Sequence, residues 1–110
     1  MITLNNFYFL NNVSAAIESP VTHSVRGESL MLQVEGTASS MKIQVLGCSD
    51  LASEEFHVLS GLDMAYNLSN EITQKGLYIF GIEGITKIKV VLSEVSGGAI
   101  SAFGKITAGV

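Results

Sequence analysis

The stretch of sequence that decides the fold is GLYIFGIEGITKIKVVLSEVSGGAISAFGKIT, residues 76–107. It contains three runs rich in β-branched and aromatic residues, Leu77–Ile82, Lys87–Val95 and Ala99–Thr107. The last two runs are separated by Ser96-Gly97-Gly98, and a Gly-Gly pair supplies the positive φ values that a tight hairpin turn needs. The pattern therefore predicts three strands, the last two joined as a β-hairpin, with the rest of the chain packed against them.

Alternation along the first of these runs divides its side chains into two sets. Tyr78, Phe80 and Ile82 fall on one face, and Leu77 and Ile79 fall on the other. Because both faces are apolar, we expect a strand that is central in its sheet or covered by an interface. In the second run, the predicted inward set is Ile88, Val90 and Leu92, and the outward set is Lys87, Lys89 and Ser93.

A second strand pair is predicted upstream, around the small-residue turn at residues 36–40. In Ser29–Glu35 every second residue is apolar, which is the period of a half-buried strand. The same alternation resumes at Met41. The apolar sets are Leu30, Leu32 and Val34 before the turn and Met41, Ile43 and Val45 after it, with Lys42 and Gln44 between them. This pattern predicts an antiparallel hairpin with one wet face.

The remaining segments predict weaker elements. Leu4–Leu10 and Val13–Ile17 form either a first pair of strands around Asn11-Asn12 or, over residues 1–11, a docking arm. Pro20 favours a turn or an edge position, and Arg26-Gly27-Glu28 predicts a turn. We expect one helical turn at Leu51–Glu55, capped by Ser49 or Asp50, then short strands at Phe56–Leu59 and Met64–Leu68 around a turn at Gly61-Leu62-Asp63, and a loop at Asn67–Asn70. Residues 1–110 are thus predicted to form a single all-β domain, an antiparallel β-sandwich (jelly-roll or Ig-like) of about eight short strands with at most one helical turn.

Composition narrows the range of functions. Only 15% of the 110 residues are charged and the mean hydropathy is +0.42, so we expect some apolar surface to be covered in a homo-oligomer. The net charge of −4 and the scattered Lys and Arg residues argue against nucleic-acid binding. No run approaches the length of a membrane-spanning helix. No Lys or Arg precedes Arg26, so the start of the chain lacks the positive region of a signal peptide. The single cysteine, Cys48, excludes an internal disulfide and is typical of folding in a reducing cytoplasm.

Catalytic and metal-binding signatures do not emerge from the residue spacing. Cys48 with His23 or His57 as its base would be the only nucleophile and base set, and it lacks a local signature. The acidic residues Asp50, Glu54, Glu55 and Asp63 fit no calcium-loop spacing, and the two histidines are far apart. We therefore expect no catalytic residue, no metal site and no cofactor, and a protein that is not an enzyme.

Aromatic residues define two candidate surfaces. Without any Trp, and with apolar neighbours, they favour core or subunit contacts, so we expect an interface drawn from Phe7, Tyr8, Phe9, Tyr78, Phe80 and Ile82. The alternative is a shallow ligand loop formed by Tyr66, Asn67 and Asn70.

Turn and strand residues over about half of the chain resemble a known family of modules. The matching pieces are Gly36-Thr37, Gly47-Cys48-Ser49-Asp50, Gly76-Leu77-Tyr78, Thr86-Lys87-Ile88-Lys89-Val90 and Ser96-Gly97-Gly98. In this pattern the chain resembles small β-sandwich modules of tailed-bacteriophage and prophage virion proteins, although Leu51 and Phe56 stand where a Trp often follows the Ser-Asp loop.

The resemblance implies a virion structural protein of the head-decoration, head-fibre or tail-accessory type, made in the host bacterial cytoplasm. Its partners would be copies of itself and other virion structural proteins, with no nucleic acid and no membrane. Two functions compete on this basis: a non-enzymatic structural or assembly protein, and a carbohydrate- or receptor-binding sandwich. A sugar binder should expose aromatic side chains in its loops, whereas an assembly protein should bury them at subunit contacts.

Overall fold

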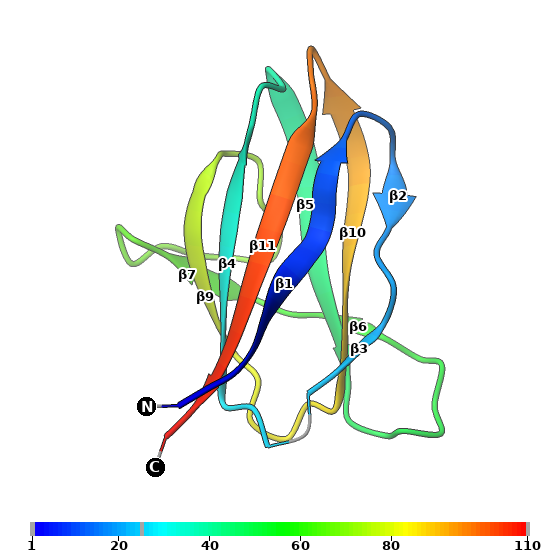
Figure 1. Cartoon of the computed structure of the whole chain (residues 1–110), viewed down its shortest axis with the longest axis vertical. Coiled ribbons are helices and arrows are strands. Elements are labelled where there is room, and N and C mark those ends of the chain that lie inside the picture. Colours follow the sequence, from blue (N-terminus) through cyan, green and yellow to red (C-terminus); the bar gives the residue numbers. More distant parts are fainter. Residues whose placement is uncertain (1, 25, 110) are drawn as a thin grey trace.

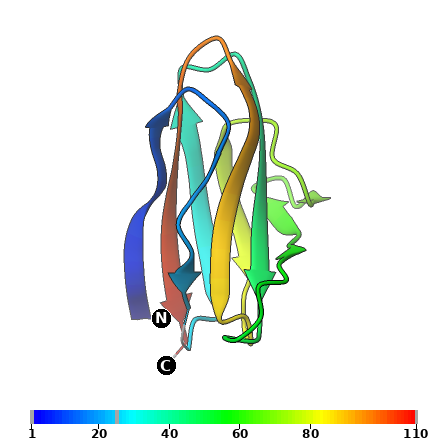
Figure 2. The same cartoon turned by 90° about the vertical axis from the view of Figure 1, so that its right-hand side faces the viewer.

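The computed structural model describes residues 2–24 and 26–109. Met1, at the start of the predicted docking arm, and Val110, at the end of the predicted domain, lie outside these residues. Two antiparallel sheets pack face to face, as Figures 1 and 2 show, so the predicted β-sandwich is confirmed. Over the described ranges the chain contains no helix. It therefore has no helical segment in these ranges that could cross a membrane.

Within the described residues, eleven strands make up the two sheets. In chain order they are β1 (Ile2–Val13), β2 (Ile17–Glu18), β3 (Thr22–His23), β4 (Ser29–Gly36), β5 (Ser40–Cys48), β6 (His57–Val58), β7 (Gly61–Asp63), β8 (Leu68–Ser69), β9 (Gly76–Gly81), β10 (Lys87–Ser96) and β11 (Ile100–Ala108). The six-stranded sheet has the order β1-β11-β4-β9-β7-β8, and the five-stranded sheet has the order β2-β10-β5-β6, with β3 also paired to β10.

Both predicted hairpins are wrong in their pairing, although their strands are present. β4 pairs with β11 and β9, while β5 pairs with β10 and β6, so the turn between β4 and β5 crosses from one sheet to the other. The turn between β10 and β11 crosses in the same way. Alternation cannot distinguish a hairpin from such an arch, because both connections leave every second side chain facing the core.

The two arches lie side by side at one end of the sandwich, at the top of Figure 1. Thr37 N donates to Ala99 O over 2.9 Å, and Ser39 N donates to Ser96 O over 2.9 Å. Gly98 has φ 148°, and a Cβ there would lie 2.6 Å from Thr37 Oγ1. The Gly-Gly pair is therefore needed for close contact between two arches, not for a hairpin turn.

The predicted pairing of the first two strands is also wrong. β1 continues through Asn11-Asn12 to Val13 and pairs with β11, with Asn12 at φ 55° where the register shifts. β2 joins the other sheet beside β10. A role of residues 1–11 in docking stays a prediction, and within the sandwich β1 is an edge strand.

Pro20 lies between β2 and β3, which together form an interrupted edge along β10. This is the edge position expected for a residue without a backbone N–H. Ser19 maintains the ladder beside it, since Ser19 N donates to Val90 O and Val90 N donates to Ser19 Oγ, each over 2.8 Å.

The weaker elements differ in detail from the predictions. Leu51-Ala52 forms a turn, with Ala52 N donating to Asp50 Oδ1 over 2.9 Å, and the predicted helix does not form. The strand at Phe56–Leu59 is confirmed as β6. Gly61-Leu62-Asp63, predicted as a turn, is β7, and Met64–Leu68, predicted as a strand, is mainly the tip of the β7–β8 hairpin.

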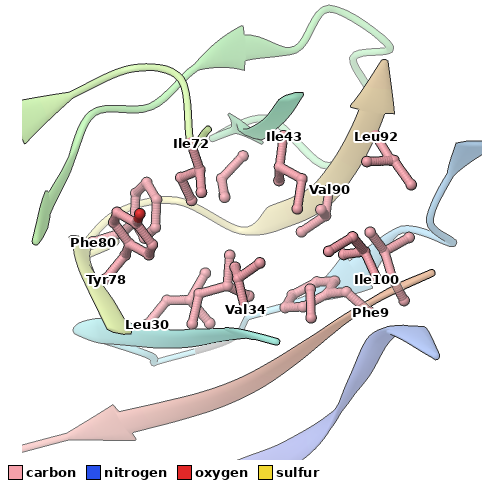
Figure 3. Close-up of a cluster of buried hydrophobic side chains, with 14 of the residues drawn as sticks. Phe9, Leu30, Val34, Ile43, Ile72, Tyr78, Phe80, Val90, Leu92 and Ile100 are labelled. Carbon is pink, nitrogen blue, oxygen red and sulfur yellow. The ribbon is translucent and has the colours of Figure 1, made fainter. Parts of the chain in front are cut away.

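The core lies between the sheets and contains the alternating apolar sets of the long strands. Leu30, Leu32 and Val34 from β4 face Ile88, Val90 and Leu92 from β10, and all six are buried (Figure 3 shows Leu30, Val34, Val90 and Leu92). Figure 3 also labels six further members of this cluster: Phe9, Ile43, Ile72, Tyr78, Phe80 and Ile100. The predicted inward faces are thus confirmed for both strands, but Lys87, predicted to point outward, is buried.

Candidate interaction surface

Four of the six residues predicted for the interface lie in the core of the chain itself. Phe9, Tyr78, Phe80 and Ile82 are all buried there. Phe7 is half-buried against the same core, and its ring packs at a tilt of 57° against that of Phe9, with centroids 4.6 Å apart. Tyr8 is 49% exposed. Alternation separates the two faces of a strand but does not say which face points inward, and for β9 the face predicted to form the interface is the inward one.

The opposite face of β9 presents Leu77 and Ile79, which are 37% and 38% exposed. The register of the sheet places Ile79 between Met31 on β4 and Leu62 on β7, and Leu62 lies opposite Leu68 on β8. Cross-strand neighbours share a face and touch through their side chains. Met31, Ile79, Leu62 and Leu68 therefore form an apolar row across the outside of the six-stranded sheet.

A second row runs beside it. Tyr8 on β1 lies opposite Phe103 on β11, and their rings meet edge to face with centroids 5.2 Å apart. Phe103 is next to Gln33, which is next to Leu77. We call the seven apolar side chains of the two rows the outer patch: Tyr8, Met31, Leu62, Leu68, Leu77, Ile79 and Phe103.

Polar residues surround the outer patch. Lys105 lies beside Met31, and Glu35 follows Gln33 along β4 and accepts a hydrogen bond from its side chain over 3.2 Å. An apolar centre with a charged rim is the composition of protein interfaces. Of the seven residues of the outer patch, the predicted interface contains only Tyr8. Met31 stands on the face of its strand that is expected to be wet, and Leu62 and Leu68 stand in segments predicted as a turn and a short strand.

The β7–β8 hairpin carries the predicted ligand loop. Asp63 organises its tip, since its carboxylate accepts the backbone N–H groups of Asn67 and Ala65, each over 2.9 Å. Chiefly through the Asn67 N–H, these bonds hold the pKa of Asp63 below its ordinary value of 3.8. Tyr66 is 83% exposed and has φ 66°, a left-handed conformation that is uncommon for an aromatic residue.

The polar partners predicted for that loop are partly occupied. The Asn67 side-chain amide donates to Asp63 Oδ2 over 3.4 Å, and Asn70 is exposed beyond β8. A shallow cavity of about 220 Å³ adjoins the hairpin and includes Asp63, Met64 and Gln74 in its lining. The structure therefore brings Tyr66 and Asn67 together at the tip and leaves Asn70 apart from it.

The candidate nucleophile Cys48 and its two candidate bases, His23 and His57, all lie in the five-stranded sheet. Cys48 is buried, and its Sγ donates to Asp50 O over 3.3 Å. Cys48 and His57 both line a cavity of about 430 Å³, whereas His23 lies on β3 opposite Lys87. Within residues 2–24 and 26–109, no three His, Cys, Asp or Glu side chains cluster as metal ligands would.

The fold of this chain also occurs in known protein structures. Two solved structures superpose on nearly the whole chain. The SPBc2 prophage-derived protein YomS matches with a TM-score of 0.85 at 19% identity, over 96% of this chain and 95% of that one. The PBSX exported protein XepA matches with a TM-score of 0.87 at 22% identity, over 93% of this chain but 37% of that one. This chain shares their fold.

The same sandwich thus accounts for nearly all of YomS and for about a third of the length of XepA. No protein-family model and no curated protein matches the sequence. At these identities the likeness is one of architecture.

Proposed function

We propose that this chain is a non-enzymatic structural or assembly protein of a bacteriophage or prophage, and that its copies pack through the outer patch. The observation that carries the proposal is the outer patch on one sheet, which extends from Tyr8 on β1 to Leu68 on β8 and is interrupted by Gln33 in one of its two rows. A surface of this kind on a small protein usually marks a contact with another molecule. The low charged fraction, 15%, supports the same interpretation.

The phage assignment draws on two independent sources. The sequence resembles virion sandwich modules in its turn residues, and both proteins of the same fold are named for prophages. We place the protein in the virion, as a head, head-fibre or tail accessory made in the host bacterial cytoplasm. Its partners would be copies of itself and other virion structural proteins, without nucleic acid or membrane.

The mass in solution tests the proposal. Light scattering across a wide concentration range should find a discrete oligomer that survives dilution. Ile79→Lys puts a charge at the centre of the outer patch and should yield a monomer with an unchanged melting temperature. Ile17→Lys is the matched control, because Ile17 is 49% exposed on β2 of the other sheet. A monomeric parent protein, or an Ile79→Lys variant of unchanged mass, would contradict the proposal.

A carbohydrate- or receptor-binding function is the second candidate, and Tyr66 favours it. A non-glycine residue in the left-handed region carries a backbone cost of about 1–3 kcal/mol, and such strain is often retained for function. Binding to host cells or to a glycan array, lost in Tyr66→Ala and retained in Ile79→Lys, would support this candidate. Binding in neither protein would leave it without support.

A further inference from the structure

The segment Asp50–Phe56 closes over one end of the five-stranded sheet, and a buried ammonium group holds it there. We call this segment the strap; it is the loop between β5 and β6 at the lower right of Figure 1. Lys87, only 6% exposed, donates from Nζ to Leu51 O over 3.2 Å and also to Ser53 O. Its Nζ also lies 5.5 Å from the centroid of the Phe56 ring. Three points along the strap thus converge on one charge.

Cys48 lies beneath the same segment. It is directly opposite Lys87 in the β5–β10 ladder. Its Sγ donates to Asp50 O over 3.3 Å and lies 4.0 Å from Ser53 O, which also accepts from Lys87. The strap therefore covers the thiol with backbone carbonyl groups, one of which Lys87 also engages.

Both ends of the strap are anchored independently of Lys87. Thr86 Oγ1 donates to Ser49 O over 2.9 Å, and Thr86 N donates to Cys48 O over 3.0 Å. At the other end, His57 of β6 pairs with Gly47 of β5. Between these anchors the strap contributes little to the core, since Leu51 is 62% exposed and Phe56 is half-buried against lysine side chains.

We propose that the strap opens as a unit while the sandwich stays folded. The Lys87 ammonium holds the strap closed, and opening exposes Cys48 to solvent. Segments with few buried apolar contacts open locally at free energies below that of global unfolding. Opening returns the Lys87 ammonium to water, so no unpaired charge is left buried. Opening breaks hydrogen bonds to a charged donor, and each such bond changes the opening equilibrium by about tenfold or more. The strap is thus a conformational device that the proposed assembly function does not require.

The single cysteine makes the opening measurable. An aromatic disulfide reagent reacts only with accessible Cys48: the thiolate attacks one sulfur, a new disulfide forms, and the coloured thiolate leaves. With the whole chain, we expect slow labelling whose rate rises only weakly with urea below the unfolding transition. In Lys87→Met, labelling should be about tenfold faster or more, with cooperative unfolding retained.

Lys89→Met is the matched control, because Lys89 lies two positions along β10 from Lys87 and bonds no strap carbonyl in the described part of the chain. Its Nζ lies 4.5 Å from the centroid of the Phe56 ring and pairs with Glu18. Because Lys89→Met removes only this ring contact and an ion pair with an exposed partner, its labelling rate should rise by at most about fivefold, less than in Lys87→Met. An acceleration in Lys87→Met that is larger than in Lys89→Met reports opening of the strap. Equal rates in the two variants would overturn the proposal.

If Lys87→Met does not fold, the urea dependence of the Cys48 labelling rate in the parent protein still shows whether the strap opens separately from global unfolding. Local opening exposes little surface and gives a shallow slope, whereas labelling through global unfolding follows the full m-value. A slope equal to the global m-value would show that no separate open state of the strap exists.

Discussion

Replacing Ile88 with aspartate should abolish the soluble fold. Ile88 is fully buried on β10, between Thr22 on β3 and Gly47 on β5. Removing the buried side chain costs about 2–5 kcal/mol. Holding the introduced carboxyl neutral at pH 7, about 3 pH units above its ordinary pKa, costs about 4 kcal/mol more.

The sum of about 6–9 kcal/mol is comparable to the whole stability of a domain of this size, about 5–15 kcal/mol. The assay is the soluble yield at pH 7, followed by thermal melting monitored by circular dichroism. Ser93→Asp on the same strand is the control, because Ser93 is exposed and should tolerate the charge.

The introduced carboxyl would have a higher pKa when folded than when unfolded, so its destabilising effect should weaken as the pH falls towards the unfolded value. A soluble Ile88→Asp variant that melts cooperatively at pH 7 would refute the assignment of this strand face to the core.

Three further changes test other parts of the fold. Deleting residues 1–11 removes most of β1 with its buried side chains, so we expect cooperative melting to be lost; a folded but less associated variant would instead support a docking arm. Gly61→Ala would place a Cβ 2.5 Å from the Phe80 ring, which is buried, and should lower the free energy of unfolding in urea by about 1–3 kcal/mol; an unchanged midpoint would mean that the ring has room to shift. Because the folded pKa of Asp63 lies below its ordinary value of 3.8, the hydrogen bonds that its carboxylate accepts are fully present above that pH and weaken as the pH falls through the folded value. The amide protection factor of Asn67, measured by NMR, should therefore drop on acidification, and a protection factor that does not change as the carboxyl of Asp63 titrates would contradict this account.

The strands of this fold follow from the sequence, but their partners do not. Alternation identifies the faces of β4, β5 and β10, since a half-buried strand needs every second residue apolar. The Gly-Gly turn after Ser96 does have positive φ, as predicted, but it does not close a hairpin. An arch and a hairpin make the same demand on local sequence, and only the packing of the turn against Thr37 distinguishes them.

The residues of the outer patch could not be predicted from the sequence for a different reason. For β9 both faces are apolar, so the pattern offers no sign of which face is inside. Tyr78 and Phe80, predicted to form the interface, fill the core, and Leu77 and Ile79 face outward. The patch also depends on register, because residues from β1, β4 and β8 join it only through pairings between distant parts of the chain.

The burial of Lys87 could not be predicted from the sequence for a third reason. A lysine in an alternating strand is ordinarily solvated, and its burial requires carbonyl groups that come from the strap. Those groups belong to a loop that has no regular structure of its own, and the sequence gives no means of placing them.

The position of β11 determines when this sandwich can fold during synthesis. β11 pairs with β1 on one side, where Ile2 lies opposite Ala108, and with β4 on the other. Until residues 100–108 leave the ribosome, the N-terminal strand has no neighbour and the six-stranded sheet has a gap between β1 and β4. Pairings across such sequence distances slow folding relative to local hairpins. A growing chain therefore presents unpaired strands until β11 is made, and early termination before this strand would leave a product that chaperones or proteases must remove.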